Sequence, residues 1–264
     1  MSDSPVGPVA LFDSGVGGLS VLREVERLLP GQDLLYLADT GYGPYGDRGL
    51  RNVRDRTSEV AGFLIDRGAE VVVVACNSAS AAALSELRRL RPGTLFVGME
   101  PAVKPAAKVS DRAVVGVMAT EATFQGELFA SVVDRFARDV SVVARACPGL
   151  AAAIESDDPS LDGLLEVYVS SLVGRGADVI VLGCTHYPFV ADRIAGLAGP
   201  DVEIVDPAPA VAAQLARVLE TEGLEVEAAS LGTTTYLATG DADRFSARAS
   251  ALLSRDVTAT TVRV

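Results

Sequence analysis

The stretch RGAEVVVVACN at residues 67–77 is matched by RGADVIVLGCT at residues 175–185, so the chain contains an internal repeat. Arg, Gly, Ala, two Val and Cys occupy identical places in the two copies. Each copy is a short Val-rich run, which is typical of a strand buried in a parallel sheet. A repeat of this kind predicts two similar structural units in one chain.

Outside the repeat, short apolar runs alternate with amphipathic stretches, which indicates an α/β fold of mostly parallel sheets covered by helices. Two helices are well marked: residues 18–29, ended by Pro30 and Gly31, and residues 78–91, opened by a capping residue and ended by Pro92. We expect strands at residues 6–12, 33–37, 70–75, 94–98, 113–118, 140–144, 178–183, 202–205 and 257–263.

The repeat predicts two pseudo-symmetric α/β domains. We expect the first to contain residues 1–99 and 209–264, and the second to contain residues 100–208. The same offset places Asp13 on Glu121, after the first strand of each unit. Because ligands of open parallel sheets bind at the carboxyl ends of the strands, we expect a binding site where the two repeated cysteines lie.

The composition limits the classes of partner that we expect the protein to bind. The 264 residues carry 23 Lys and Arg against 35 Asp and Glu, a formal net charge of -12. Such a surface repels phosphate backbones and anionic lipids, so we expect neither nucleic acid nor membrane as a partner. The chain shows no secretory signal and no apolar run long enough to span a bilayer. Three widely spaced cysteines predict free thiols in a reducing compartment, which favours a cytoplasmic location.

Few residues are available for cofactor chemistry. Lys104 and Lys108 are the only lysines, so a pyridoxal Schiff base would need one of these two. The repeated cysteines, the single histidine and Asp13 are permissible zinc ligands, but the chain lacks the usual C-x-x-C or H-x-x-x-H spacing. We expect neither a metal nor another cofactor.

The two repeated cysteines are the strongest candidates for chemistry. Cys76 lies between a strand and a helix, where the helix N-terminus favours a thiolate. Cys184 occupies the corresponding strand end and is followed two residues later by His186, the only histidine, which could orient a thiol, donate a proton or bind a carboxylate. Two cysteines at corresponding strand ends favour function, whereas Cys147 is interpreted as a small buried apolar residue.

The loop DSGVGG at residues 13–18 allows two functional interpretations. A dinucleotide fingerprint would use Asp39 to bind a ribose, but Ser20 stands where the third glycine is expected, and an acid after the strand would face a pyrophosphate. In the alternative, Asp13 polarises a reacting group while Ser14 and the loop amides hold an anion.

Two further segments are less specific. The turn PYG at residues 44–46 has exposed amides that could bind a carboxylate. Glu155 precedes Ser-Asp-Asp-Pro and could equally be a solvated acid. The residues alone leave both roles open.

Several blocks, in order, resemble the glutamate racemase family of cofactor-independent amino-acid racemases. They are LFDSGVGGLSVLREV, YLADTGYGPYGDR, VVACNSASA, GMEPAV, ATEAT, LGCTHYPF and TGDADRF, and they cover residues 11 to about 245. The chain departs from the family pattern in GLAAAIESDDP, where bulkier apolar residues are usual, and at Ala119, where the family often has glycine.

The resemblance implies racemisation of glutamate in a cleft between the two domains, supplying D-glutamate for peptidoglycan synthesis. It implies that Cys76 and Cys184 transfer the proton and that Asp13, His186 and Glu155 assist them. A homodimer is left open. The implied substrate contacts are Asp13, Ser14, Tyr45, Gly46, Asn77, Ser78, Thr120, Thr123, Thr185 and His186.

Three other functions remain open at this point. A racemase of aspartate or another acidic amino acid would differ in the depth of its pocket. A Cys-His hydrolase or transferase would form a thiol ester and would not need Cys76. A binding module would hold its ligand without exchanging a proton with solvent.

Overall fold

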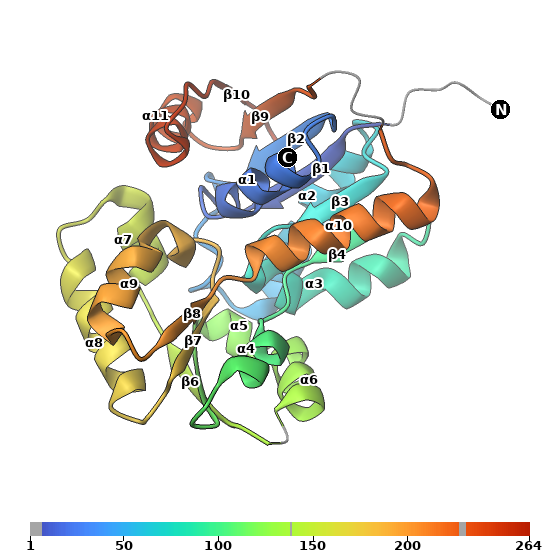
Figure 1. Ribbon diagram of the computed structural model, residues 1–264. Helices are drawn as coiled ribbons and strands as arrows, with labels where there is room; N and C mark the ends of the chain where they lie inside the picture. Colours follow the sequence, from blue (N-terminus) through green and yellow to red (C-terminus); the bar gives the residue numbers. More distant parts are fainter. Residues whose placement is uncertain (1–6, 138, 227–230) are drawn as a thin grey trace.

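A computed structural model describes residues 7–137, 139–226 and 231–264 and contains two all-parallel sheets (Figure 1). The larger sheet has the order β10-β9-β2-β1-β3-β4, and the smaller has the order β6-β5-β7-β8. The strands are β1 (Val9–Asp13), β2 (Leu34–Ala38), β3 (Val71–Val74), β4 (Leu95–Gly98), β5 (Val114–Ala119), β6 (Ser141–Ala146), β7 (Val179–Gly183), β8 (Glu203–Val205), β9 (Thr234–Ala238) and β10 (Ala259–Thr261).

The internal repeat is visible in the strand order. Within the larger sheet, β2-β1-β3-β4 has the same arrangement as β6-β5-β7-β8 in the smaller. The two repeated sequences become β3 and β7, each paired with the central strand of its sheet. The predicted fold class, mostly parallel sheets covered by helices, is therefore confirmed.

Helices cover both faces of each sheet because successive strand side chains point to opposite sides. In the larger sheet, α1, α10 and α11 pack on one face and α2 and α3 on the other; in the smaller, α7, α8 and α9 oppose α4 and α6. The helices are α1 (Leu19–Leu28), α2 (Leu50–Ile65), α3 (Asn77–Leu90), α4 (Val103–Val109), α5 (Glu121–Gln125), α6 (Glu127–Phe136), α7 (Leu150–Ser156), α8 (Leu161–Val173), α9 (Ala191–Ala198), α10 (Ala208–Glu222), α11 (Ala242–Leu253) and the short 3-10 helix η1 (Tyr187–Val190).

The carboxyl-terminal segment extends the larger sheet. After α10 packs beside α1 (Figure 1), β9 pairs with β2 and β10 pairs with β9. The expected strand 257–263 is found in part as β10, whereas β9 was not expected. Residue 6 of the expected strand 6–12 lies outside the described residues. The proposed domain limits at residues 99 and 209 stay a prediction.

No helix in the described ranges has the length and apolar character needed to cross a membrane.

Candidate active site

The site is a cavity between the carboxyl ends of the two sheets. Its walls are loops that follow β1, β2 and β3 of the larger sheet and β5, β6 and β7 of the smaller. The enclosed space is narrow, about 30 Å³. The predicted site residues that line it are Ser14, Tyr45, Gly46, Cys76, Asn77, Ser78, Thr120, Cys184, Thr185 and His186.

Three predicted residues lie behind this wall. Asp13 and Thr123 hydrogen-bond to lining residues, and Glu155 contacts His186 from an adjoining cavity. Sequence reasoning missed several lining residues, although the strand ends before Glu121 and Cys147 pointed to that edge. The missed residues are Asp47, Glu121, Cys147, Pro148, Gly149, Ala151 and Ala152, whereas Pro44 belongs to the turn singled out from the sequence.

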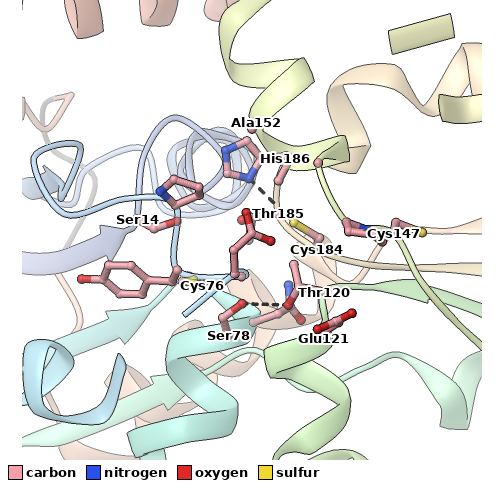
Figure 2. Close-up of a pocket in the computed structure, with 18 residues that line it drawn as sticks. Ser14, Cys76, Ser78, Thr120, Glu121, Cys147, Ala152, Cys184, Thr185 and His186 are labelled. Carbon is pink, nitrogen blue, oxygen red and sulfur yellow. Dashed lines mark hydrogen bonds between the residues drawn. The ribbon is translucent and has the colours of Figure 1, made fainter. Parts of the chain in front are cut away.

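The two repeated thiols come from opposite halves of the molecule and lie on either side of the cavity (Figure 2). Cys76 follows β3 and is the N-cap of α3, while Cys184 follows β7. Both cysteines are buried. The third thiol, Cys147, is committed to a different contact because its Sγ donates to the carbonyl of Arg145 at 3.3 Å.

The electrostatic prediction for Cys76 was wrong. Burial, followed by the negative charge of Asp13, raises the pKa of the Cys76 thiol, although the backbone amides of Ala79 and Ser14 favour the thiolate. The N-terminal end of α3 therefore does not outweigh desolvation in this closed cavity. The helix also begins one residue earlier than predicted, without a side-chain cap.

Cys184 has a different neighbour. His186 Nδ1 lies 3.7 Å from Cys184 Sγ, and His186 Nε2 lies 2.7 Å from Glu155 Oε2. Burial disfavours a charged imidazole, but the hydrogen bonds with Cys184 and Glu155 prevail and raise the pKa of His186 well above its ordinary value. A protonated His186 donates from both ring nitrogens, one to the sulfur and one to the carboxylate.

Asp13 connects the two halves from beneath the cavity. Its carboxylate accepts the Gly15 amide at 2.8 Å and the Thr185 hydroxyl at 3.0 Å. Burial raises the pKa of Asp13 despite the favourable charge of His186 and these hydrogen bonds. Ser20 adds a second link by donating to the carbonyl of Thr185 at 3.0 Å. These contacts hold Thr185 against the first glycine loop.

That loop is glycine-rich because the second half of the molecule packs directly on it. A Cβ atom at Gly15 would overlap the carboxylate of Glu155, and one at Gly17 would overlap His186 and Thr185. The glycines thus allow the groups around Cys184 to approach β1. This close approach accounts for the loop without the dinucleotide site considered from the sequence.

Uncharged donors complete the cavity. The side-chain amide of Asn77 is buried, and neither its oxygen nor its nitrogen has a hydrogen-bond partner within the described part of the chain. Ser78 and Thr120 hydroxyls lie 3.0 Å apart across the two halves (Figure 2), and Thr123 lies 3.0 Å from Thr120. Because buried polar groups normally find partners, the unpaired Asn77 amide is available for a ligand.

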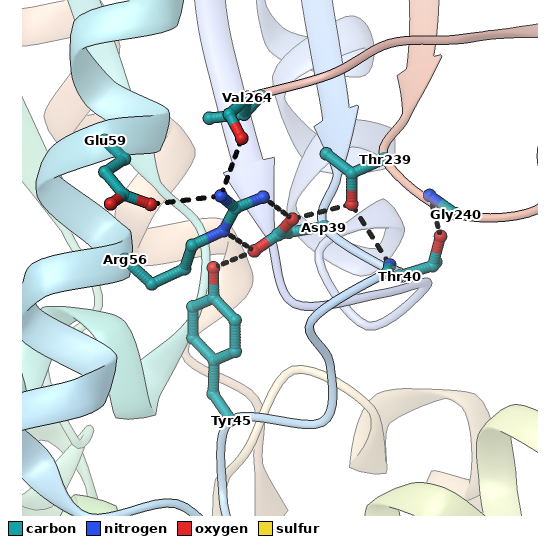
Figure 3. A network of polar contacts seen from close by, with 9 residues as sticks. Asp39, Thr40, Tyr45, Arg56, Glu59, Thr239, Gly240 and Val264 are labelled. Atoms are coloured by element: carbon teal, nitrogen blue, oxygen red, sulfur yellow. Dashed lines mark hydrogen bonds and ion pairs between the residues drawn. The ribbon is translucent and has the colours of Figure 1, made fainter.

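A buried network supports the loop that carries Tyr45 (Figure 3). Asp39 accepts two hydrogen bonds from Arg56, at 2.7 and 2.8 Å, one from Tyr45 at 2.5 Å and one from Thr239 at 2.6 Å. Burial would raise the pKa of Asp39, but its hydrogen bonds, led by those from Arg56, lower it instead. Arg56 also donates to the carbonyl of Val264 at 3.0 Å. The carboxylate of Asp39 is therefore hydrogen-bonded to groups of the protein itself.

Among the described residues, no three His, Cys, Asp or Glu side chains converge in a group that could hold a metal ion.

Comparison with known proteins agrees with this fold. Two similar parallel sheets each contribute a thiol to one cavity, so both halves of the molecule take part in a single site. Residues 16–215 match the model of the Asp/Glu/hydantoin racemase family. The chain belongs to this racemase family, which confirms the resemblance found in the sequence blocks.

The individual relatives described next are all glutamate racemases. A curated glutamate racemase from Roseiflexus is 51% identical over 249 residues, covering 93% of this chain and 92% of its own. The structure of a glutamate racemase from Bacillus anthracis is 28% identical, with a TM-score of 0.91 and 99% of both chains covered. The glutamate racemase of Escherichia coli, solved in complex with L-glutamate and an activator, is 27% identical, with a TM-score of 0.83 over 98% of this chain and 99% of its own.

Substitution Gly17→Ala should lower racemase activity about 100-fold, because the added methyl group displaces His186 and Thr185 from their places beside Cys184. Steady-state kinetics measures the loss. Gly196→Ala, at an exposed helical position with open space around it, is the matched control and should keep wild-type activity. Wild-type activity in Gly17→Ala would contradict the packing role given to this glycine.

Substitution Arg56→Gln should reduce the free energy of unfolding by about 3–5 kcal/mol, because it leaves the Asp39 carboxylate buried without its cationic partner. Urea denaturation at neutral pH measures the difference. Arg51→Gln, at an exposed position of the same helix, should change it by less than about 0.5 kcal/mol.

The Arg56 effect also has a defined pH dependence. Because the folded-state pKa of Asp39 is lowered, the stability that its ionisation contributes is present above its unfolded value and is lost as the pH falls through the folded value. The gap between wild type and Arg56→Gln should therefore narrow below about pH 4. A gap that stays constant into acid would contradict the ion pair as its cause.

Proposed function

We propose that this protein interconverts L- and D-glutamate without a cofactor, with Cys76 and Cys184 as the two groups that exchange the α-proton. The observation that carries the proposal is the placement of one thiol from each half on either side of a single cavity. The identity to curated glutamate racemases supports glutamate as the substrate.

Inversion at carbon explains why two thiols are needed. One thiolate removes the α-proton from one face of the substrate, and the opposite thiol delivers its own proton to the other face of the resulting carbanion. The first cysteine ends as a thiol and the second as a thiolate, so the charge is conserved. The reverse direction uses the same two groups with exchanged roles.

The surroundings of the two sulfurs suggest their resting forms. Cys76 is protonated at rest, because burial and Asp13 raise its pKa. An imidazolium at His186, held by Glu155, stabilises a thiolate on Cys184. The reaction requires one thiol and one thiolate, and the proposal assigns the thiolate to Cys184.

The cavity also suits an anionic substrate on an acidic protein. Neutral donors such as Asn77, Ser78 and Thr185 and the nearby backbone amides can hold carboxylates without bringing a net positive charge. In a closed, water-poor site, these preorganised donors stabilise negative charge as it develops on the substrate.

Substrate binding requires the two halves to separate. The enclosed volume of about 30 Å³ is far below the roughly 150 Å³ of a cavity that holds benzene. The contacts of Thr185 with Asp13 and of Ser78 with Thr120 join the halves, so these contacts loosen when the substrate is admitted. Closure then excludes water around the reacting carbon. In a bacterial cytoplasm, the product D-glutamate would supply peptidoglycan synthesis.

Substitution of either thiol separates the two half-reactions. Cys76→Ala and Cys184→Ala should each lower racemisation by at least about 100-fold, since one proton carrier is removed. Each variant should still exchange the α-proton of one enantiomer with solvent, and the two variants should act on opposite enantiomers. Circular dichroism of the substrate measures racemisation, and proton NMR in heavy water measures exchange.

Cys147→Ala is the matched control because it removes the third buried thiol, which donates to a backbone carbonyl. This variant should retain racemisation. Normal racemisation by either the Cys76 or the Cys184 variant, or exchange of the same enantiomer by both, would contradict the two-thiol mechanism. Faster turnover of L-aspartate than of L-glutamate by the wild type would contradict the assigned substrate.

A further inference from the structure

One arginine connects the two halves beside the cavity. Arg248 lies on α11, which is anchored in the core of the larger sheet through Phe245 and Ala249. Its Nη2 donates to the carbonyl of Ile154 at 2.5 Å, and Ile154 is buried in the core of the smaller sheet. Arg248 therefore joins α11 to α7, which are separate helices of the two halves (Figure 1).

The accepting carbonyl is at the end of a helix that has little support of its own. α7 contains seven residues, and its N-cap, Gly149, provides no side-chain hydrogen bond. The amides of Asp157 and Asp158 both turn back to the carbonyl of Ala153. The following carbonyl, that of Ile154, receives the guanidinium instead. A cation is favoured here because the last carbonyls of a helix lack intrahelical partners and carry partial negative charge.

The residue after Ile154 is Glu155, the carboxylate that accepts from His186 at 2.7 Å. Glu155 keeps 28% of its side chain exposed and faces an adjoining cavity of about 330 Å³, which Arg248 also lines. Solvent can therefore reach Glu155. The position of the α7 backbone decides whether its carboxylate stays within hydrogen-bonding distance of the imidazole.

We propose that Arg248 is a positioning residue for the racemase: by binding the carbonyl of Ile154, it holds α7 where Glu155 meets His186 in the closed molecule. The order of contacts is Arg248, the Ile154 carbonyl, Glu155, His186 and Cys184. This inference rests on the proposed function, because it assigns His186 to the support of the Cys184 thiolate.

The charged groups around this series of contacts determine how the pKa of His186 should respond. His186 faces Cys184 from β7, Glu155 from α7 and Asp13 from β1. Arg248 faces Asp157 at 3.8 Å from α7. On α11, Asp241 and Arg244 line the same adjoining cavity as Arg248. Weakening the contact with Glu155 removes one of the interactions that favour a charged imidazole, so the pKa of His186 should fall.

The decisive experiment uses Arg248→Met, which keeps an unbranched apolar stem but removes the guanidinium and its donors. His186 is the only histidine of the chain, so NMR titration of untagged protein with isotope-labelled histidine reads this imidazole directly. We expect the pKa of His186 to fall by about one unit or more, the basic limb of the pH–kcat profile to move in the same direction, and kcat to fall about 10- to 100-fold.

Two further variants identify the route of the effect. Glu155→Gln should produce the same direction of change, and combining it with Arg248→Met should add little, since both act through one contact. Arg244→Met is the matched control: it lies on the same helix and lines the same cavity, but no hydrogen bond or ion pair joins it to α7 among the described residues. It should leave the titration and kcat unchanged. Arg248→Lys, which keeps the charge, should give an intermediate titration.

The possible outcomes are distinct. An unchanged His186 titration in Arg248→Met, or equal shifts in Arg248→Met and Arg244→Met, would overturn the inference. If Arg248→Met does not fold, the titration of Arg248→Lys decides, and a wild-type value there overturns it. Failure of the wild type to racemise glutamate would instead overturn the proposed function, whatever the titrations show.

Discussion

The structure depends on the burial of ionisable groups at the contact between two sheet edges. Asp13, His186 and the two cavity thiols are all nearly inaccessible to solvent. Charges in such a place are tolerated only when they are paired and hydrogen-bonded. Asp13 is hydrogen-bonded across the halves by Thr185. His186 is instead paired with Cys184 and Glu155 of its own half, and it packs on the glycine loop of the other.

The repeated backbone does not produce a symmetric site. The strands that carry Cys76 and Cys184 occupy the same position in their sheets. Cys76 is close to the carboxylate of Asp13, whereas Cys184 is close to the imidazole of His186. Similar strands thus place two sulfurs in different surroundings. A reaction that starts with one acid and one base needs this asymmetry.

Local sequence patterns predicted the parts that depend on local physics. Val-rich runs and the repeat predicted the parallel sheets, and the strand ends predicted Cys76 and Cys184 at one edge. The strand β9 was missed because only its last three residues are buried and its partner β2 lies far away in the sequence. The helix N-terminus was a poor guide to Cys76, because burial depends on residues from both halves.

Interactions across long separations were beyond prediction from one sequence. Asp39 meets Thr239 across 200 residues, and Arg248 meets Ile154 across 94. Neither arginine of these contacts, Arg56 or Arg248, stands in a distinctive motif. Neither arginine lines the cavity between the two thiols. Arg56 binds Asp39, which holds Tyr45, and Arg248 binds α7, the helix that carries Glu155. Such positioning groups become visible only when the fold brings them together.

Following hydrogen at Cα during the first turnovers of L-glutamate in heavy water tests directly whether two opposed thiols move the α-proton. Two opposed thiols predict that newly formed D-glutamate carries deuterium while the remaining L-glutamate keeps its protium, because the proton is taken on one side and a solvent deuteron is delivered on the other. D-glutamate that retains the original protium, or equal early labelling of both enantiomers, would contradict the two-thiol mechanism.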